Sequence, residues 1–312
     1  MGKKKFTGVS QFLARFRGWI QAGAALLTNL HLPNFLKGRL YQGAGKTVCV
    51  PGLNCYSCPA ASGACPIGAF QAVVGSSKFS FSYYITGILI LLGVLLGRFI
   101  CGFLCPFGWF QELLHKIPSR KLSTRKLKPL RYLKYAILLV MVFLLPAFLV
   151  NDVGMGDPFF CKYLCPQGVL EGAIPLSLAN SGIRAALGSL FTWKFGILLV
   201  VIVLSVLFYR PFCKWICPLG AFYALLNKVS LVQMKVDQSK CISCGKCAKA
   251  CKMDVDVTKS PNHTECIRCG MCVRACPTNA VRFRCGFGTG KQGTVLPEKT
   301  NKQMNIVKEK KS

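Results

Sequence analysis

The chain has 312 residues, of which 52% are hydrophobic and only 16% charged. This composition excludes intrinsic disorder and is unusual for a pair of soluble domains. The formal net charge of +30 comes from 40 Lys and Arg against 10 Asp and Glu. Because these basic residues lie beside long apolar runs, we expect them to orient a membrane protein rather than to bind nucleic acid. The composition therefore predicts an integral membrane protein.

Apolar runs predict four membrane-spanning helices. Three runs are long enough to cross about 30 Å of hydrocarbon, at residues 81–100, 132–150 and 191–209. A less apolar run at about 17–36 follows a basic leader that includes Lys3 to Lys5. A cleaved signal peptide is the alternative for that run, but its small residues precede most of its apolar ones, whereas a cleavage site should follow them. We therefore expect an uncleaved first span.

The distribution of basic residues predicts the orientation of these spans. The loop between the second and third spans is rich in Lys and Arg, and Glu112 is its only acid, so the positive-inside rule places it in the cytoplasm. Four crossings then put both termini in the cytoplasm. We expect a multi-pass protein of a prokaryotic cytoplasmic membrane, with a membrane domain at 1–230 and a basic, disordered tail at 286–312.

One pattern, Cys-Pro-x-Gly followed by two apolar residues, occurs four times. Proline directly after the cysteine suits a first helical position, so each copy is expected to open a short helix. The alternation of the copies along the chain predicts a pseudo-twofold repeat, in which the first two spans correspond to the last two. The copies begin at Cys65, Cys105, Cys165 and Cys217, and three of them have another cysteine four residues earlier, at Cys101, Cys161 and Cys213.

The predicted topology places the second and fourth copies at the cytoplasmic ends of their spans. Their cysteines, here called the inner quartet, supply four thiolates, the number that a [4Fe-4S] cluster needs. The inner quartet consists of Cys101, Cys105, Cys213 and Cys217.

The remaining copies fall in the two outer connections, where Cys161 and Cys165 need two further ligands. We expect Cys58 and Cys65 to complete an outer [4Fe-4S] site. Disulfides or packed thiols are the alternative, because the outer side is an oxidising compartment. The less favoured candidate ligands are Cys49 and Cys55.

Residues 231–285 contain two tandem runs of the spacing Cys-x2-Cys-x2-Cys-x3-Cys, which is typical of bacterial ferredoxins. In such runs three cysteines hold one [4Fe-4S] cluster and the fourth reaches the other. A zinc ribbon is the alternative, but it uses spacers of other lengths. The first run ends in Cys251-Lys252 instead of Cys-Pro, which leaves its turn geometry open. The predicted ligands are Cys241, Cys244, Cys247 and Cys276 for one cluster, and Cys266, Cys269, Cys272 and Cys251 for the second.

Spans that end in Cys-x3-Cys-Pro, followed directly by a double ferredoxin segment, resemble the NapH-like membrane ferredoxins and the membrane part of NosR-like proteins. The resemblance covers roughly residues 80–285. It implies four transmembrane helices, a cytoplasmic two-cluster ferredoxin domain, and electron transfer between a quinol or soluble donor and an extracytoplasmic acceptor. The outer cysteines depart from the NapH pattern, and neither a flavin-attachment motif nor a NosR-like outer domain is present.

The expected fold is an all-α polytopic membrane protein with a C-terminal bacterial-type 2[4Fe-4S] ferredoxin domain. The expected function is electron relay in the lipid bilayer, from a redox protein in the cytoplasm to a redox protein outside. A quinone oxidoreductase module with structural outer cysteines is the alternative, and a redox sensor ranks last. No side chains form a nucleophile or acid–base constellation, so the protein is an electron carrier or an oxidoreductase subunit whose cofactors supply the chemistry. Cys285 is unassigned.

Overall fold

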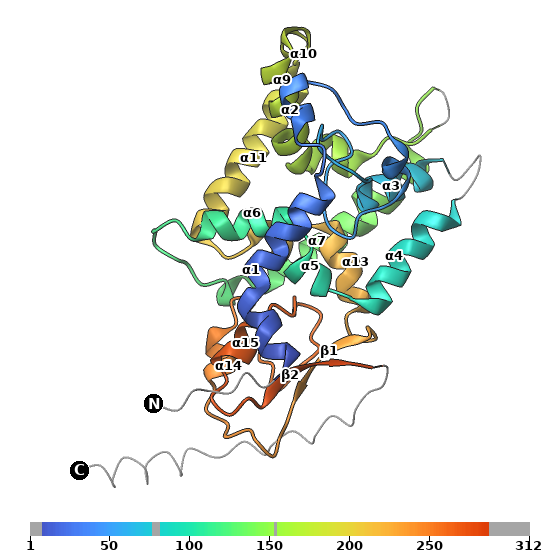
Figure 1. Ribbon diagram of the computed structural model, residues 1–312. Coiled ribbons are helices and arrows are strands. Elements are labelled where there is room, and N and C mark those ends of the chain that lie inside the picture. Colours follow the sequence, from blue (N-terminus) through green and yellow to red (C-terminus); the bar gives the residue numbers. More distant parts are fainter. Residues whose placement is uncertain (1–7, 77–81, 153–154, 287–312) are drawn as a thin grey trace.

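The computed structural model describes residues 8–76, 82–152 and 155–286 and is mostly helical (Figure 1). The basic residues Lys3 to Lys5 and nearly all of the predicted tail lie outside the described residues. The α-helices are α1 (Val9–Thr28), α2 (Pro33–Lys37), α3 (Pro66–Gly75), α4 (Tyr83–Leu95), α5 (Phe99–Phe103), α6 (Pro106–His115), α7 (Leu133–Ile137), α8 (Leu145–Phe148), α9 (Ile174–Ala179), α10 (Ser181–Ala185), α11 (Ser189–Leu207), α12 (Pro211–Trp215), α13 (Pro218–Leu226), α14 (Lys246–Ala250) and α15 (Met271–Ala275).

Short helical segments and two strands complete the described structure. Narrow 3₁₀ turns lie at Ala44–Thr47, Arg125–Leu127 and Pro129–Tyr132, and wider π-helical segments at Leu138–Leu144, Phe160–Leu164 and Gly168–Ala173. The strands are β1 (Val232–Val236) and β2 (Val281–Cys285), which pair antiparallel with Val232 opposite Cys285.

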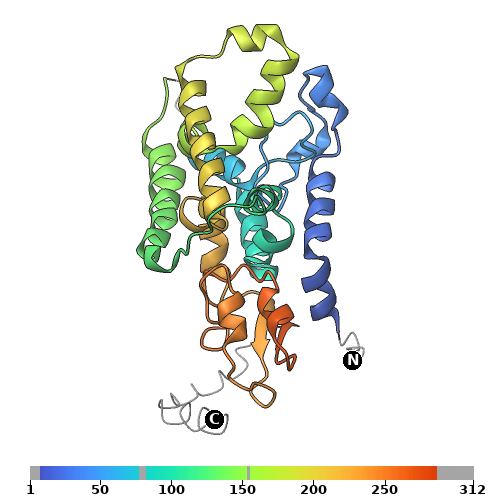
Figure 2. The same cartoon turned by 90° about the vertical axis from the view of Figure 1, so that its left-hand side faces the viewer.

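The molecule is elongated, with the two strands, α14 and α15 at one end (Figures 1 and 2). Helices α1 and α11 and the continuous helix Pro129–Phe148 run roughly along its long axis, and α9 and α10 lie at the far end. Short helices follow the four Cys-Pro steps, and the cysteines of these steps, Cys65, Cys105, Cys165 and Cys217, are buried.

Two helices in the described residues are long and apolar enough to cross a membrane, Pro129–Phe148 and Ser189–Leu207. They match the predicted spans at 132–150 and 191–209. Three further apolar helices are shorter: Pro66–Gly75, Tyr83–Leu95 and Gly168–Ala179.

The predicted span at 81–100 is not one continuous helix. Helix α4 ends at Leu95, and Gly97 adopts the left-handed conformation with φ +54°. A side chain at Gly97 would crowd Arg268 Nη1, at 2.8 Å, and Asn227 Oδ1, at 2.9 Å. The break brings Arg98 to a fully buried position where it pairs with Glu265 of the ferredoxin segment, 3.0 Å away. This buried ion pair explains why an arginine interrupts the apolar run.

Helix α1 also differs from the prediction, because it begins at Val9 rather than near residue 17 and ends at Thr28. Its first half packs on the ferredoxin segment: Ala14 is buried in the same apolar cluster as Met234 and Val273, and Gln11 Nε2 donates to Asn279 Oδ1 at 2.8 Å. The residues of α1 that precede the predicted span therefore anchor the ferredoxin segment.

The two halves of the ferredoxin segment repeat one backbone pattern. Cys251 and Cys276 have nearly the same conformation, with φ −77° and ψ 106° and 116°, so Lys252 in place of a proline does not change the turn. Left-handed residues occur at matched positions of the two runs, in the pairs Ser243 and Arg268, Gly245 and Gly270, and Asp254 and Asn279.

Candidate metal centres

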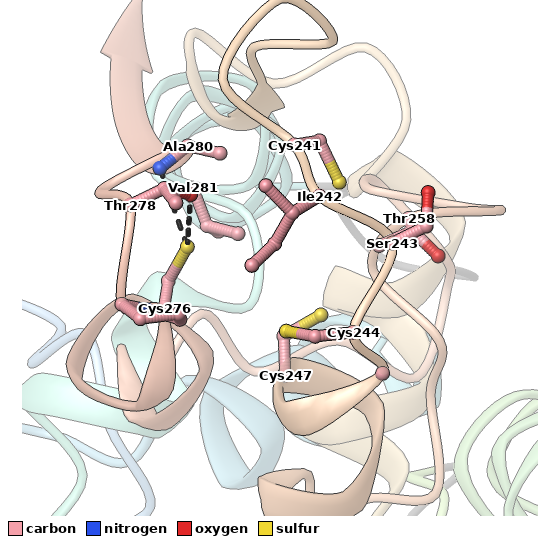
Figure 3. A pocket seen from close by; sticks show the side chains of 12 residues that line it. Cys241, Ile242, Ser243, Cys244, Cys247, Thr258, Cys276, Thr278, Ala280 and Val281 are labelled. Carbon is pink, nitrogen blue, oxygen red and sulfur yellow. Dashed lines mark hydrogen bonds between the residues drawn. The ribbon is translucent and has the colours of Figure 1, made fainter. Parts of the chain in front are cut away.

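The first ferredoxin pocket, here called the distal pocket, lies between the first run and the end of the second. Its lining includes Cys241, Cys244, Cys247 and Cys276, whose side chains face the same space from separate segments (Figure 3). Backbone amides already point at this space, since Ala280 N donates to Cys276 Sγ at 3.3 Å. Cys244 is exposed, so this pocket lies near the protein surface.

The second ferredoxin pocket, here called the proximal pocket, is lined by Cys251, Cys266, Cys269 and Cys272. Each pocket thus gathers three cysteines of one run and the fourth of the other, which is the exchange that the sequence predicts. Met253 and Ile267, beside this pocket, belong to the same buried apolar cluster as Cys101 and Cys217. The proximal pocket therefore faces the membrane part of the chain.

The Cys-Pro-x-Gly motif is a helix cap whose acceptor is sulfur. At the fourth copy Cys217 is the N-cap of α13, Pro218 is at the first helical position, and Gly220 N donates to Cys217 Sγ at 3.3 Å. The glycine N–H acts on the cysteine thiol in the same way in the other three copies. Because a helix N-terminus favours negative charge, the motif stabilises a thiolate in a buried place.

The structure brings the inner quartet together. Burial raises the pKa of the Cys105 thiol to about 12, and charge on Cys213 and Cys101 would raise it further. Burial likewise raises the pKa of Cys217, with additional contributions from Cys213, Cys101 and Cys105. Buried cysteine sulfurs that lie this close together are suited to a shared cationic iron–sulfur core, which neutralises the charge of their thiolates.

On the outer side the structure groups Cys55, not Cys58, with the predicted cysteines. Burial raises the pKa of Cys165 to about 12, and charge on Cys55 and Cys65 adds to the rise. Cys58 Sγ lies 3.6 Å from Asn29 Oδ1 in a small cluster with Ala60 and Ala61, against which Cys55 also packs, and Cys58 is not among the charges that act on Cys165. We therefore define the outer quartet as Cys55, Cys65, Cys161 and Cys165.

Close packing supports this grouping. A Cβ on Gly68, three residues after Cys65, would lie 3.8 Å from Cys161 Sγ, and a Cβ on Gly168, three residues after Cys165, would lie 3.6 Å from Cys55 Sγ. Each of these two cap turns thus faces a cysteine from elsewhere in the outer quartet. Cys49 forms a short backbone bridge with Ala64, the residue before Cys65, and Cys285 is exposed at the end of β2.

Two glutamines that were not predicted as site residues make equivalent hydrogen bonds, one at each quartet. Gln71 Nε2 donates to Cys161 Sγ and Gln111 Nε2 donates to Cys213 Sγ, both at 3.2 Å. Gln71 and Gln111 each lie six residues after the cysteine of their own copy, one position beyond the compared pattern. Extending the repeat comparison by one residue would have found them.

Buried cations surround the inner quartet. Arg210 donates to the carbonyl oxygen of Cys101, and Arg98 Nη2 donates to that of Cys213 at 3.5 Å. At the outer quartet Lys194 Nζ donates to the carbonyl oxygen of Cys161 at 3.0 Å. Four thiolates with an iron–sulfur core carry net negative charge, so these cations fit such an occupant.

The proximal pocket and the inner quartet are in direct contact. Gly102 follows Cys101 in α5, and a Cβ there would clash with the carbonyl oxygen of Ile267 and lie 3.7 Å from Cys269 N. Only glycine permits this approach of two backbones, in each of which the preceding residue, Cys101 or Cys266, is a predicted ligand.

In the described part of the chain, no three His, Cys, Asp or Glu side chains lie close enough to hold one metal ion. The cysteines of the two ferredoxin pockets line a cavity each.

Two family models match the chain, both described as a 4Fe-4S binding domain. One matches residues 63–84, 80–125, 134–174 and 190–237, and the other matches residues 234–255 and 260–282. The four matches of the first model each contain one Cys-Pro-x-Gly copy. No solved structure matches.

Similar curated proteins share somewhat more than a quarter of their aligned residues with this chain. An uncharacterised protein of Methanocaldococcus jannaschii is 28% identical over 55% of this chain and 66% of its own length. The putative electron transport protein YccM of Escherichia coli is 28% identical over 54% of this chain and 45% of its own. The ferredoxin-type protein NapH of Haemophilus influenzae is 28% identical over 48% and 66%. The matches thus span about half to two thirds of these relatives.

Proposed function

Because the chain belongs to the NapH/NosR-like family of [4Fe-4S] polyferredoxins, we propose that it relays electrons through four clusters between a cytoplasmic donor and an extracytoplasmic acceptor. The distal and proximal pockets would hold two clusters, and the inner and outer quartets one each. A bound [4Fe-4S] cluster supplies one-electron redox chemistry. The relatives named ferredoxin-type or electron transport proteins support this reading.

The observation that carries the proposal is the order of the cysteine sets. The exchange of the fourth cysteine joins the distal pocket to the proximal pocket, and the Gly102 contact joins the proximal pocket to the inner quartet. An exposed entry point is thereby connected to cysteines inside the helical part. The protein's own contribution is to position these sets, exclude water from the inner ones and compensate their charge with buried cations.

We further propose that the chain crosses a prokaryotic cytoplasmic membrane, with the ferredoxin segment and both termini in the cytoplasm. The two long apolar helices support a membrane location, and the basic loop before Pro129 supports this orientation. Four crossings require two further spans, to which α1 and α4 would each contribute. Soluble redox proteins are the proposed partners on both faces.

Single cysteine replacements test the cluster assignment on anaerobically purified protein. Cys55→Ser and Cys165→Ser should each lose about four iron atoms per chain, one cluster, and should stop reduction of an external acceptor. The ferredoxin clusters should stay reducible from the cytoplasmic side. Cys58→Ser and Cys285→Ser are the matched controls and should keep the full iron content.

Two results would overturn the assignment. Loss of iron in Cys58→Ser together with retention in Cys55→Ser would exclude the outer quartet as we define it. Unchanged iron in both Cys55→Ser and Cys165→Ser would make the outer cysteines structural and favour a quinone oxidoreductase module.

A further inference from the structure

The chain segment Pro51–Asn54 runs through the interior between the two quartets. Leu53 and Asn54 are buried, with 2% and 0% of their surface exposed, although no regular helix or strand contains them. Loops normally run over the surface because their polar backbone groups need partners. A loop in this position therefore requires a reason.

On one side the segment lies against the inner quartet. A Cβ on Gly52 would be 2.8 Å from Cys105 Cα and 3.1 Å from Pro106 Cδ, so glycine is needed for this contact. Tyr223, fully buried on α13, donates its hydroxyl to the carbonyl oxygen of Pro51 at 3.0 Å. The segment is thus held in place by the two helices that follow the inner Cys-Pro steps.

On the other side the segment leads directly into the outer quartet. Cys55 follows Asn54, and its amide donates to Glu171 Oε2 at 3.1 Å. Three residues of fully extended chain cover at most about 11 Å, so the Cα atoms of Cys55 and Cys105 lie within roughly 15 Å of each other. This upper limit on the Cα–Cα distance is about half of the thickness of the hydrocarbon layer, roughly 30 Å, that the predicted topology puts between the two quartets.

Hydrogen bonds and ring packing also connect the inner quartet with the outer quartet. The backbone amide of Leu53 hydrogen-bonds to the Cys105 thiol, and the backbone amide of Asn54 hydrogen-bonds to the Cys65 thiol. Successive amides thus act on one cysteine of each quartet. Phe70 of α3 and Phe222 of α13, each five residues after a quartet cysteine, lie with ring centroids 6.5 Å apart.

We propose that the Pro51–Asn54 segment is the electron-transfer bridge between the inner and outer quartets, which are neighbouring stations inside the protein. The inference rests on the proposed function. The inner and outer quartets would each hold a cluster, and one electron would pass from the reduced inner cluster to the oxidised outer cluster without any bond forming or breaking. Tyr223 is a positioning residue that fixes the segment through Pro51.

The direct test is the magnetic interaction between the two clusters, observed by EPR as splitting or faster relaxation when both are reduced. The wild-type protein should show this interaction, and Cys165→Ser should lose it together with one cluster. Gly52→Ala and Tyr223→Phe should keep the wild-type iron content while the interaction weakens and electron transfer to an external acceptor slows. Gly23→Ala, whose Cβ would meet nothing within 4 Å, is the matched control and should change nothing.

The outcomes separate the two proposals. If iron analysis shows no cluster in the outer quartet, the proposed function fails. If both clusters are present but show no magnetic interaction in the wild-type protein, the bridge is excluded while the relay stands. Wild-type behaviour of Tyr223→Phe, with the interaction unchanged, would remove Tyr223 from the bridge. Should Gly52→Ala fail to fold, the wild-type spectrum and Tyr223→Phe still decide the question.

Discussion

Gln71 and Gln111 each hydrogen-bond to the sulfur of a quartet cysteine without being candidate ligands themselves. Each donates an N–H to a cysteine that belongs to the partner copy of the repeat, at 3.2 Å. Hydrogen bonds to the sulfur ligands of a cluster stabilise its reduced, more negative form. The two glutamines therefore should hold the reduction potentials of the quartets above the values that burial alone would give.

Replacement of either glutamine by leucine should lower one potential only. A hydrogen bond worth about 1 kcal/mol corresponds to roughly 40 mV for a one-electron couple, so Gln111→Leu should lower the inner potential by about that amount. Gln71→Leu should do the same at the outer quartet, and each variant serves as the control for the other. EPR-monitored redox titration measures both. Identical titrations for wild type and both variants would contradict a tuning role.

At the scale of elements, the contact between α5 and the ferredoxin loop depends on a missing side chain. A Cβ on Gly102 would meet the carbonyl oxygen of Ile267, and backbone atoms cannot move aside as a flexible side chain can. Gly102→Ala should therefore separate the proximal pocket from the inner quartet. We expect the ferredoxin clusters to remain reducible by a soluble donor, while reduction of the inner cluster slows by at least about tenfold, equivalent to about 1.4 kcal/mol in barrier.

Stopped-flow reduction followed at each cluster measures this prediction. Gly196→Ala in α11, whose Cβ would contact nothing within 4 Å, provides the control and should behave as wild type. Equal inner-cluster reduction rates in Gly102→Ala and wild type would show that electrons do not pass at this contact.

A buried ion network joins the ferredoxin segment to the helices. Glu265 lies 3.0 Å from Arg98 Nη1 and 2.5 Å from Lys134 Nζ, and Arg98 and Lys134 are fully buried. Burial opposes ionisation of Glu265, but Arg98 and Lys134 outweigh it and lower the pKa of the carboxyl to about 2. The carboxylate is therefore charged at neutral pH and forms ion pairs with both buried cations.

Glu265→Gln should leave these cations unpaired and destabilise the docked ferredoxin segment by about 3–5 kcal/mol. Thermal loss of cluster absorbance should consequently occur at a lower temperature. Asp237→Asn, which breaks exposed ion pairs to Lys240 and Arg282 in the same segment, is the control and should leave the transition unchanged. A transition temperature in Glu265→Gln equal to that of wild type would mean that this network does not hold the segment.

The limits of prediction from sequence differ between the two parts of the chain. Tight cysteine spacing determines the ferredoxin segment, because three ligands on one short loop leave little conformational freedom, and both pockets contain the predicted cysteines. Hydropathy located Pro129–Phe148 and Ser189–Leu207 because each forms an uninterrupted apolar helix. It did not give the bounds of α1 and α4, where Ala14 and Arg98 are buried against the ferredoxin segment.

The sequence also could not distinguish Cys55, which we propose as a ligand, from Cys58. Both precede Cys65 within one irregular loop, and their spacing carries no period that would distinguish them. What separates them is the path of the Pro51–Asn54 segment through the interior, which depends on the long-range contacts of Gly52 and Tyr223. Such contacts leave no local pattern in the sequence.

At the scale of the whole molecule, the proposed orientation predicts which surface each face of the membrane exposes. Ser119 lies in the basic loop and Ser181 begins α10 at the far end, and both are exposed. In intact cells an impermeant thiol reagent should label Ser181→Cys and leave Ser119→Cys at the background of the parent protein. The opposite labelling pattern would invert the orientation, and labelling of both would reject a membrane crossing between them.

The central claim is that the chain holds four clusters, two of them in the helical part. Iron and acid-labile sulfide counts per chain, measured on anaerobically purified wild-type protein, test it most directly. The account predicts about sixteen iron and sixteen sulfide, four of each per [4Fe-4S] cluster. About eight of each would mean that only the ferredoxin pockets are filled, and this result would contradict the relay through the inner and outer quartets.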